Sequence, residues 1–357
     1  MKKLLIAFAV LLFIALVIVT ARGRISFGGK TEEADGEYFR LGTIVRLRLF
    51  GKDKKFLEDE LARGDAEIAR IESLFSANIS DSDVCRAGDA GGEWVEVSPE
   101  TYMLVKRALE IAEETNGAFD PAIGRITGLW KIGTEEARLP GAEEIRAALP
   151  SCGYRNISLK EEDGARFMKL SKGARIDLGA IAKGRAADIL AKKLSEDGVK
   201  SALVDLGGNL ALIGAKPDGK AWRLGIQDPR KARGEYFGVV EASDSSIVTS
   251  GPYERFFEKE GARYHHIFDS ATGYPAKSEF SSVTVADKDS TKADALCTAF
   301  FVMGRARAEK YLEKHKEIAA IFLLDGENKI LITDAARGLF TPTDKSFSLE
   351  SIGKGKK

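Results

Sequence analysis

The sequence predicts an α+β fold, and two observations lead to that prediction. Segments with the two-residue period of strands are mixed with segments in which apolar residues recur every three or four positions, as in amphipathic helices. The two kinds do not alternate strictly, which argues against a doubly wound parallel sheet. With 357 residues, of which 44% are hydrophobic and 30% charged, the chain can bury a large core without disulfide or metal staples.

The N-terminal segment differs from the rest of the chain. Two lysines precede an apolar run of 18 residues, from Leu4 to Ala21. A secretory apolar region spans about 7–15 residues and a membrane-spanning helix about 17–25, so this run lies at the boundary between them. Because no clear small-residue cleavage site follows, we expect residues 1–21 to form an uncut signal anchor. A cleaved signal peptide and a buried core helix are the alternatives. The lack of a polar face argues against the core helix.

The charge balance and the cysteine content limit the partners and the kinds of cysteine site that the sequence supports. Lysine plus arginine and aspartate plus glutamate both number 54, so no basic excess points to nucleic acid. The three cysteines, Cys85, Cys152 and Cys297, show neither redox nor metal-type spacing, and we expect them to be structural.

The first globular elements follow a polar, Gly-rich tether over residues 22–36. Residues 42–50 alternate Val and Leu with Thr and Arg, which predicts a strand. Residues 52–74 are charged and place apolar side chains at helical spacing, which predicts an amphipathic helix. Further helices are expected over residues 99–115, 142–148 and 180–194, and a strand over residues 201–206.

In the C-terminal half, a helix is expected over residues 291–315. Strand-like residues 320–324 and 329–333 flank the segment Asp325-Gly326-Glu327-Asn328, whose Asp-Gly pair is a turn signal, so a hairpin is predicted. We therefore expect one globular domain over residues 37–342 and a frayed tail over residues 343–357.

The densest constellation of polar and small residues runs from Asp177 to Gly184. A strand-like start leads into a turn of glycine and small residues and then into a helix, whose N-terminus can face an anion. Lys183 would add a positive charge for a phosphate. Taken alone, this signal is weak, because Gly-rich turns between strands and helices are common.

Two further groups carry ionisable or metal-binding chemistry. His265 and His266 are adjacent, and neighbouring residues of a strand point to opposite faces, so at most one of them can face a site. Asp294 and Thr298 are four residues apart and share one face of the predicted helix. Carboxylate, hydroxyl and carbonyl oxygens are the ligands that Mg²⁺ takes. In isolation, each group also has a purely structural interpretation.

The order and spacing of these segments together are far more specific than any one of them. Over roughly residues 38–340 the chain resembles the ApbE family, the FAD:protein FMN transferases. The matching stretches are Leu41-Gly42-Thr43, Gly117 to Pro121, Asp177 to Gly184, Gly207-Gly208-Asn209, Trp222 with Gly225 to Pro229, Thr249-Ser250-Gly251, His266-Ile267 with Thr272-Gly273, and Ala293-Asp294-Ala295 with Thr298.

The resemblance implies an ApbE-like, T-fold-like arrangement of mixed sheets with packed helices. The apolar run from Leu4 to Ala21 predicts one hydrophobic helix before it. The resemblance also implies roles for several of the matching residues. Mg²⁺ would be held by the side chains of Asp294 and Thr298 and by the carbonyl of Ala180. FAD, the substrate, would contact Asp177, Lys183 and Ile267, the stretch Ala118-Phe119-Asp120, and Leu41, where the family usually has Met. His266 would take the proton of the acceptor hydroxyl.

The implied reaction is physically coherent. Mg²⁺ and Lys183 would neutralise the FAD diphosphate. His266 would activate a weak threonine or serine nucleophile, FMN would be transferred, and AMP would be released. At Asn78 the family commonly has a tyrosine, which could stack on a ring of FAD as asparagine cannot. An FAD diphosphatase that forms FMN and AMP, and a non-catalytic FAD-binding protein, therefore remain alternatives.

The resemblance and the apolar N-terminus together imply where the protein works. We expect the catalytic domain on the extracytoplasmic, periplasmic side of the cytoplasmic membrane, tethered by the N-terminal helix. The implied acceptors are exported flavoprotein subunits of membrane redox complexes, such as the sodium-pumping NADH:quinone reductase or Rnf-type complexes.

Overall fold

The computed structural model describes residues 31–343 and 345–354. The predicted signal anchor and the first part of the tether therefore lie outside the described residues. Within the part of the chain that is described, no helix is both long and apolar enough to span a bilayer.

A mixed sheet of nine strands forms the centre of the molecule, in the order β1–β2–β6–β7–β10–β15–β16–β17–β19. Its strands are β1 (Glu32–Arg40), β2 (Thr43–Gly51), β6 (Ser201–Leu206), β7 (Asn209–Ile213), β10 (Ser246–Ser250), β15 (Phe280–Asp287), β16 (Ala319–Leu324), β17 (Lys329–Ile332) and β19 (Ser348–Ser351). Neighbouring strands are antiparallel except β17 and β19, which are parallel. This arrangement agrees with the expected α+β class and not with a doubly wound sheet.

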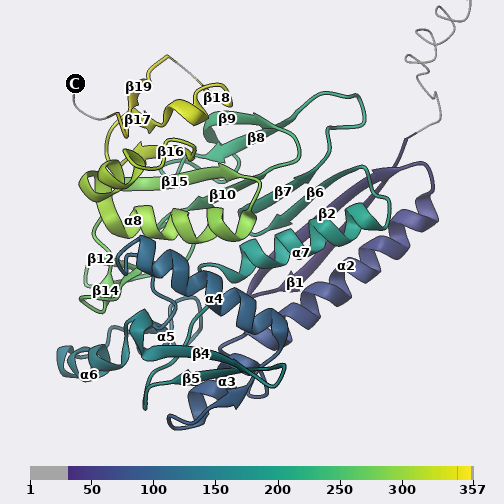
Figure 1. Ribbon diagram of the computed structural model, residues 1–357. Helices are drawn as coiled ribbons and strands as arrows, with labels where there is room; N and C mark the ends of the chain where they lie inside the picture. Colours follow the sequence, from purple (N-terminus) through teal and green to yellow (C-terminus); the bar gives the residue numbers. More distant parts are fainter. Residues whose placement is uncertain (1–30, 344, 355–357) are drawn as a thin grey trace, which may run out of the picture.

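Helices cover one face of this sheet. The described helices are α2 (Lys54–Phe75), α3 (Asp83–Asp89), α4 (Pro99–Glu114), α5 (Gly124–Trp130), α6 (Ala142–Ala148), α7 (Ala182–Glu196) and α8 (Ser290–Leu312), with short 3₁₀ turns η1 (Leu149–Ser151), η2 (Tyr154–Asn156) and η3 (Asp334–Ala336). Figure 1 shows α2, α7 and α8 side by side across the sheet, and these helices contact one another and its strands.

Smaller sheets complete the architecture. They are formed by β18 (Phe340–Pro342), β9 (Tyr236–Ala242) and β8 (Trp222–Gln227); by β3 (Val95–Glu96), β5 (Ala165–Leu170) and β4 (Ile157–Glu162); by β11 (Phe256–Lys259) and β12 (Ala262–His265); and by β13 (Phe268–Asp269) and β14 (Tyr274–Pro275).

The central sheet is buried on both faces at β16, although β1 and β2 at its edge have one exposed face. Ala320, Phe322 and Leu324 belong to the core that includes the helices, whereas Ile321 and Leu323 pack with the residues of β8 and β9. Side chains alternate across a strand, so one uninterrupted apolar run supplies both cores. The sheet thus holds α7 and α8, which carry much of the candidate site, on a rigid base.

Most of the predicted elements lie where the sequence placed them. The strand at 201–206 and the helix at 142–148 match their predictions, and the hairpin is confirmed by β16 and β17. The predicted helix at 291–315 is α8, which is interrupted at Gly304 (φ 64°, ψ −179°). All three cysteines are free thiols, and Cys152 and Cys297 are buried.

Two boundary predictions were wrong. Residues 32–36, assigned to the tether, belong to β1, which pairs with β2 along its full length. Residues 348–351, assigned to a frayed tail, form β19 against β17, and Ile352 is buried just beyond it. In both places a partner strand distant in sequence orders a segment whose own composition is polar.

Candidate active site

The N-terminus of α7 is held by a side chain of α8. Ile181, the N-cap residue of α7, has no side-chain acceptor for the first free N–H groups of the helix. Asp294 of α8 takes this role, because its Oδ2 accepts the N–H of Gly184 at 2.9 Å. A Cβ at Gly184 would lie 2.7 Å from the carbonyl carbon of Ser290, so only glycine permits this approach.

The relation between the two helices is reciprocal. Asp188 of α7 accepts the N–H groups of Ser290 and Thr291, each at 2.9 Å, and so caps α8. Burial raises the pKa of Asp188 despite these hydrogen bonds. Asp188 was not predicted from the sequence, because a single aspartate on an amphipathic helix gives no signal that its partner lies 102 residues away.

The predicted metal ligands come together at this junction. Asp294 is 2% exposed, and Thr298 follows it on the same face of α8. The structural alternative for Thr298, a hydrogen bond back to its own helix, is not formed: within the described part of the chain its hydroxyl has no partner. Ala180 immediately precedes the N-cap of α7.

Two features of the junction fit a divalent cation. The N–H of Gly184, which lies four residues after Ala180, donates to Asp294 and not to the Ala180 carbonyl, so that oxygen keeps free lone pairs. The Thr298 hydroxyl is free as well. No group of three or more histidine, cysteine or acidic residues suited to a metal occurs among the described residues. A cation here would complete its shell with water and substrate oxygens, as Mg²⁺ usually does.

Lys183 lies beside Asp294 in the first turn of α7. Its Nζ is 3.1 Å from the carbonyl oxygen of Gly179 and 3.5 Å from Asp294 Oδ1. Asp177 shapes the preceding turn, since its Oδ1 accepts the N–H of Gly179 at 2.8 Å. Lys183, Asp294 and the free carbonyl therefore form one polar cluster at the N-terminus of a helix.

The two adjacent histidines have different surroundings, and β12 ends at His265, so His266 lies just beyond the strand. His265 is buried, with Nε2 3.2 Å from the Ala276 carbonyl oxygen and Nδ1 accepting the N–H of Ile267 at 3.3 Å. His266 is partly exposed, and its Nδ1 lies 3.2 Å from the carbonyl oxygen of Arg255. That carbonyl can only accept, so Nδ1 carries the proton in the neutral ring and Nε2 is left as an acceptor.

The surroundings of His266 keep it neutral. Burial of the ring, followed by the positive charges of Arg255 and Lys183, lowers its pKa to about 3. The side chain still has partial contact with solvent, so a substrate can reach Nε2. A neutral imidazole with a free Nε2 is the form that accepts a proton.

The other predicted flavin contacts are divided between buried and exposed positions. Phe119 and Ile267 are 2% and 4% exposed and belong to the main core, so their side chains offer almost no surface to a ligand. Ala118 is buried as well. Asp120 is also buried: its Oδ1 accepts the N–H of Ala122 at 2.9 Å, while Oδ2 has no hydrogen-bond partner within the described chain. Burial raises the pKa of Asp120.

Leu41 and Asn78 are at turns. Leu41 has positive φ (53°) in the tight turn between β1 and β2, and its N–H donates to Glu72 at 2.8 Å. Asn78 is exposed, and its side chain has no partner among the described residues. An asparagine in this position leaves the adjacent surface open to water.

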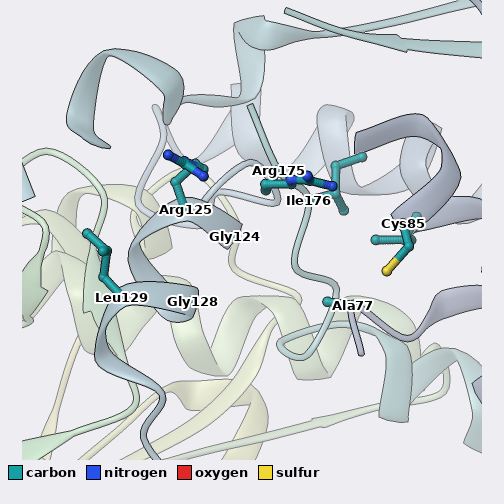
Figure 2. A pocket seen from close by; sticks show the side chains of 9 residues that line it. Ala77, Cys85, Gly124, Arg125, Gly128, Leu129, Arg175 and Ile176 are labelled. Carbon is teal, nitrogen blue, oxygen red and sulfur yellow. The ribbon is translucent and has the colours of Figure 1, made fainter. Parts of the chain in front are cut away.

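A cavity of about 300 Å³ opens next to these residues. Figure 2 shows Arg125 and Arg175 at the cavity, with Ala77 and Cys85 opposite Leu129 and Gly128. None of the predicted site residues lines it, although Ala77 adjoins Asn78 and Ile176 adjoins Asp177 in sequence. The predicted chemistry therefore does not lie in this cavity.

The chain is similar to known proteins in both sequence and fold. The model of the ApbE family matches residues 41–322. A relative from Treponema pallidum, named FAD:protein FMN transferase, is 37% identical over 297 residues, which is 79% of this chain and 82% of that protein. A Klebsiella pneumoniae protein of the same name is 33% identical over 310 residues, 87% of this chain and 94% of the relative.

Two solved structures have a similar fold to this chain. The ApbE protein of Thermotoga maritima superposes with a TM-score of 0.79 at 35% identity, covering 86% of this chain and 99% of the other. The apo flavinyl transferase ApbE of Pseudomonas stutzeri superposes with a TM-score of 0.74 at 28% identity, covering 92% and 98%.

Proposed function

The chain belongs to the ApbE family, and from this premise we propose that it is a transferase that moves FMN from FAD to a threonine or serine hydroxyl of an acceptor protein, with AMP as the second product. The observation that carries the proposal is the free Nε2 of His266, held near the Lys183–Asp294 pair. That arrangement provides a base for a hydroxyl and a charge for a phosphate.

The reaction can be written with its atoms balanced. The acceptor oxygen attacks the phosphorus on the FMN side of the diphosphate and forms a new P–O bond. Its proton passes to Nε2 of His266, and the bond from that phosphorus to the bridging oxygen breaks. AMP leaves with the bridging oxygen. Catalysis of such a transfer depends mainly on positioning and on charge compensation.

The residues of this chain have distinct parts in the reaction. The Arg255 carbonyl orients the imidazole, Lys183 compensates negative charge, and the buried Asp294 holds the end of α7. We propose that Asp294, Thr298 and the Ala180 carbonyl hold Mg²⁺. Bound there, the ion would supply Lewis-acid neutralisation of the diphosphate.

The first test is mass spectrometry of an exported flavoprotein domain incubated with the full-length protein, FAD and Mg²⁺. We expect the mass of one FMN less water to be added to a threonine or serine, and the addition to be lost with EDTA. No addition, with FMN and AMP formed instead, would replace the transferase by a diphosphatase.

The diphosphatase alternative has one observation in its favour. Asn78 is exposed and cannot stack on a flavin or adenine ring, so water has more access than beside a tyrosine. Release of AMP in the absence of acceptor measures this side reaction. The Asn78→Tyr variant should lower it, and no AMP from the wild-type protein would remove this alternative.

We also propose that the catalytic domain is extracytoplasmic and membrane-tethered, with exported flavoprotein subunits of membrane redox complexes as acceptors. The support is the apolar run from Leu4 to Ala21, which lies outside the described residues. Protease added to spheroplasts should cleave the domain, and a fully protected domain would contradict this location.

A further inference from the structure

Arg255, in the turn before β11, connects three parts of the site. Its carbonyl oxygen accepts the N–H of His266 at 3.1 Å and faces Nδ1 of the same residue at 3.2 Å. Its side chain passes Gly133, where an added Cβ would lie 3.3 Å from the arginine Cδ. Its Nη2 then donates to the Gly42 carbonyl at 3.2 Å. The guanidinium is therefore held between the loop of the base and the turn that contains Leu41.

This guanidinium has unused binding capacity. Only one of its five N–H donors forms a hydrogen bond within the described chain. No carboxylate of the described chain lies within ion-pair distance of the guanidinium. The side chain is exposed. By contrast, Arg263 on the same hairpin is paired with Glu258 at 3.0 Å and lies over the ring of Phe256. Arg255 thus offers a positioned charge and free donors.

The position of the base locates the reacting phosphorus. A general base must lie about 3 Å from the hydroxyl that it deprotonates, and the hydroxyl oxygen must approach the phosphorus to about 3–3.5 Å. The phosphorus should therefore come within about 6 Å of Nε2 of His266. The Arg255 carbonyl oxygen lies 3.2 Å from Nδ1 of this ring, and the positive charges of Arg255 and Lys183 both lower the pKa of His266, so both cations act on this part of the site.

Arg255 carries a positive charge that no carboxylate among the described residues pairs with. A diphosphate diester carries about two negative charges, which need compensation before an anionic leaving group can depart. Lys183 lies 3.5 Å from the carboxylate of Asp294, so that pair has no net charge. Of the two cationic side chains that lower the pKa of His266, Lys183 is paired with Asp294, whereas Arg255 has no carboxylate partner among the described residues.

We propose that the guanidinium of Arg255 binds the diphosphate of FAD beside Lys183 and is a catalytic residue of the transfer. This inference rests on the proposed function. A planar guanidinium can form paired hydrogen bonds to phosphate oxygens, and these are stronger than bonds between neutral groups. Its bond to Gly42 keeps it in place before the substrate arrives.

The experiment compares the full-length wild-type protein with Arg255→Gln, Arg255→Lys and the control Arg263→Gln. Glutamine removes the charge, and lysine retains it. Steady-state AMP release gives kcat and KM, and flavin fluorescence gives the affinities for FAD and for riboflavin, which has no phosphate. Circular dichroism checks that each variant is folded.

We expect Arg255→Gln to lower kcat/KM for FAD about 30-fold and to weaken FAD binding, because a charge-assisted contact to phosphate is lost. Riboflavin binding should be unchanged, Arg255→Lys should recover part of the loss, and Arg263→Gln should match the wild type. Unchanged kinetics in Arg255→Gln would overturn the inference. Equal losses of FAD and riboflavin affinity would also overturn it, because they would assign Arg255 a structural role at Gly42.

The two proposals fail in different ways. A wild-type protein that binds FAD but forms neither FMN-modified acceptor nor AMP would contradict the proposed function. The FAD and riboflavin affinities need no turnover, so they decide the role of Arg255 in either case.

Discussion

At the scale of single residues, His266 combines a fixed tautomer with a lowered pKa, and its chemistry can be tested directly. Replacing it with alanine removes the proton acceptor and should lower kcat for FMN transfer by about 10²–10⁴. His315, which stacks on Tyr311 and lies 3.5 Å from Glu317, provides a matched control, and His315→Ala should keep the wild-type rate. Equal rates in the two variants would exclude His266 as the base.

Asp294 has two roles that one pair of substitutions can separate. Asparagine can still accept the Gly184 N–H through its amide oxygen but has no charge for a cation, whereas alanine has neither. We expect both variants to lose Mg²⁺-dependent activity. Only Asp294→Ala should also lose stability, by about 1–2 kcal/mol, the usual cost of losing a helix cap. Activity titrated with Mg²⁺ and urea denaturation measure the two effects. Full activity of Asp294→Asn would contradict the metal assignment.

At the scale of elements, the reciprocal caps fix α7 against α8. Asp188→Ala removes the acceptor for two N–H groups at the start of α8, so the free energy of unfolding should fall by about 1–2 kcal/mol. Transfer activity should fall as well. Asp294 follows Ser290 and Thr291 near the start of α8, so a displaced helix start would also displace Asp294. Urea denaturation checks the stability. Lys192→Ala, on the exposed face of α7, is the control and should change neither property.

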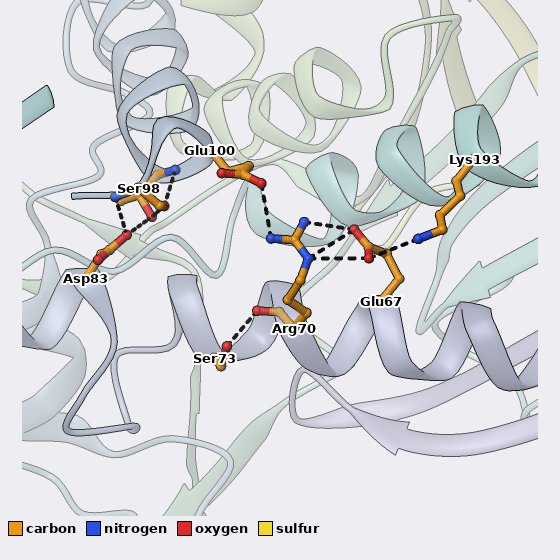
Figure 3. A network of polar contacts seen from close by, with 8 residues as sticks. Glu67, Arg70, Ser73, Asp83, Ser98, Glu100 and Lys193 are labelled. Atoms are coloured by element: carbon orange, nitrogen blue, oxygen red, sulfur yellow. Dashed lines mark hydrogen bonds and ion pairs between the residues drawn. The ribbon is translucent and has the colours of Figure 1, made fainter. Parts of the chain in front are cut away.

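A second connection between elements predicts that the free energy of unfolding depends on pH. Figure 3 shows two polar clusters around α2: Arg70 joins Glu67 and Glu100, with Lys193 of α7 also on Glu67, and Asp83 of α3 meets Ser98 before α4. Asp83 is 5% exposed. Burial raises its pKa, but hydrogen bonds from Thr101 and Ser98 and the contact with Arg86 outweigh burial, and the net pKa is lowered.

The sign of this effect follows from the lowered pKa. The ionised Asp83 stabilises the folded state fully above its unfolded pKa of about 3.9, and the stabilisation is lost as the pH falls through the lower, folded pKa. The free energy of unfolding of Asp83→Asn should therefore be below that of the wild type at pH 6, and the gap should narrow below pH 4. Urea denaturation at several pH values measures it. A gap independent of pH would contradict the assignment, and Asp81→Asn at an exposed position should show no gap.

At the scale of the whole molecule, two kinds of feature could be predicted from the sequence. The first depends on neighbouring residues in the chain, and the second consists of motifs that follow one another in a known order. Helical spacing predicted α2, and an Asp-Gly turn predicted the β16–β17 hairpin, because both depend on neighbours in the chain. The ordered motifs around Asp177, His266 and Asp294 predicted the candidate site as a set. Their exact roles remain predictions.

What the sequence did not predict depends on contacts between distant segments. Asp188 acquires its role from α8, and Arg255 acquires its role from Gly42, 213 residues away. The exclusion of Phe119 and Ile267 side chains from a pocket follows from how the main core closes around them. Periodicity and composition contain none of these pairings, since each is set by the way the sheet brings remote turns together.

The order of the C-terminal segment also depends on contacts with residues distant in sequence, and its contribution to stability can be tested. Ile352 is 3% exposed beyond β19, and Gly353 lies against Leu312 of α8, so the tail closes one edge of the core. Ile352→Ala should lower the free energy of unfolding by about 2–4 kcal/mol, as expected for a buried isoleucine. Leu349→Ala, on the same segment but 40% exposed, should cost much less. Urea denaturation compares the two. Equal, small losses would mean that the tail is frayed in solution, and the β17–β19 pairing would then contribute nothing to holding the sheet beneath α8.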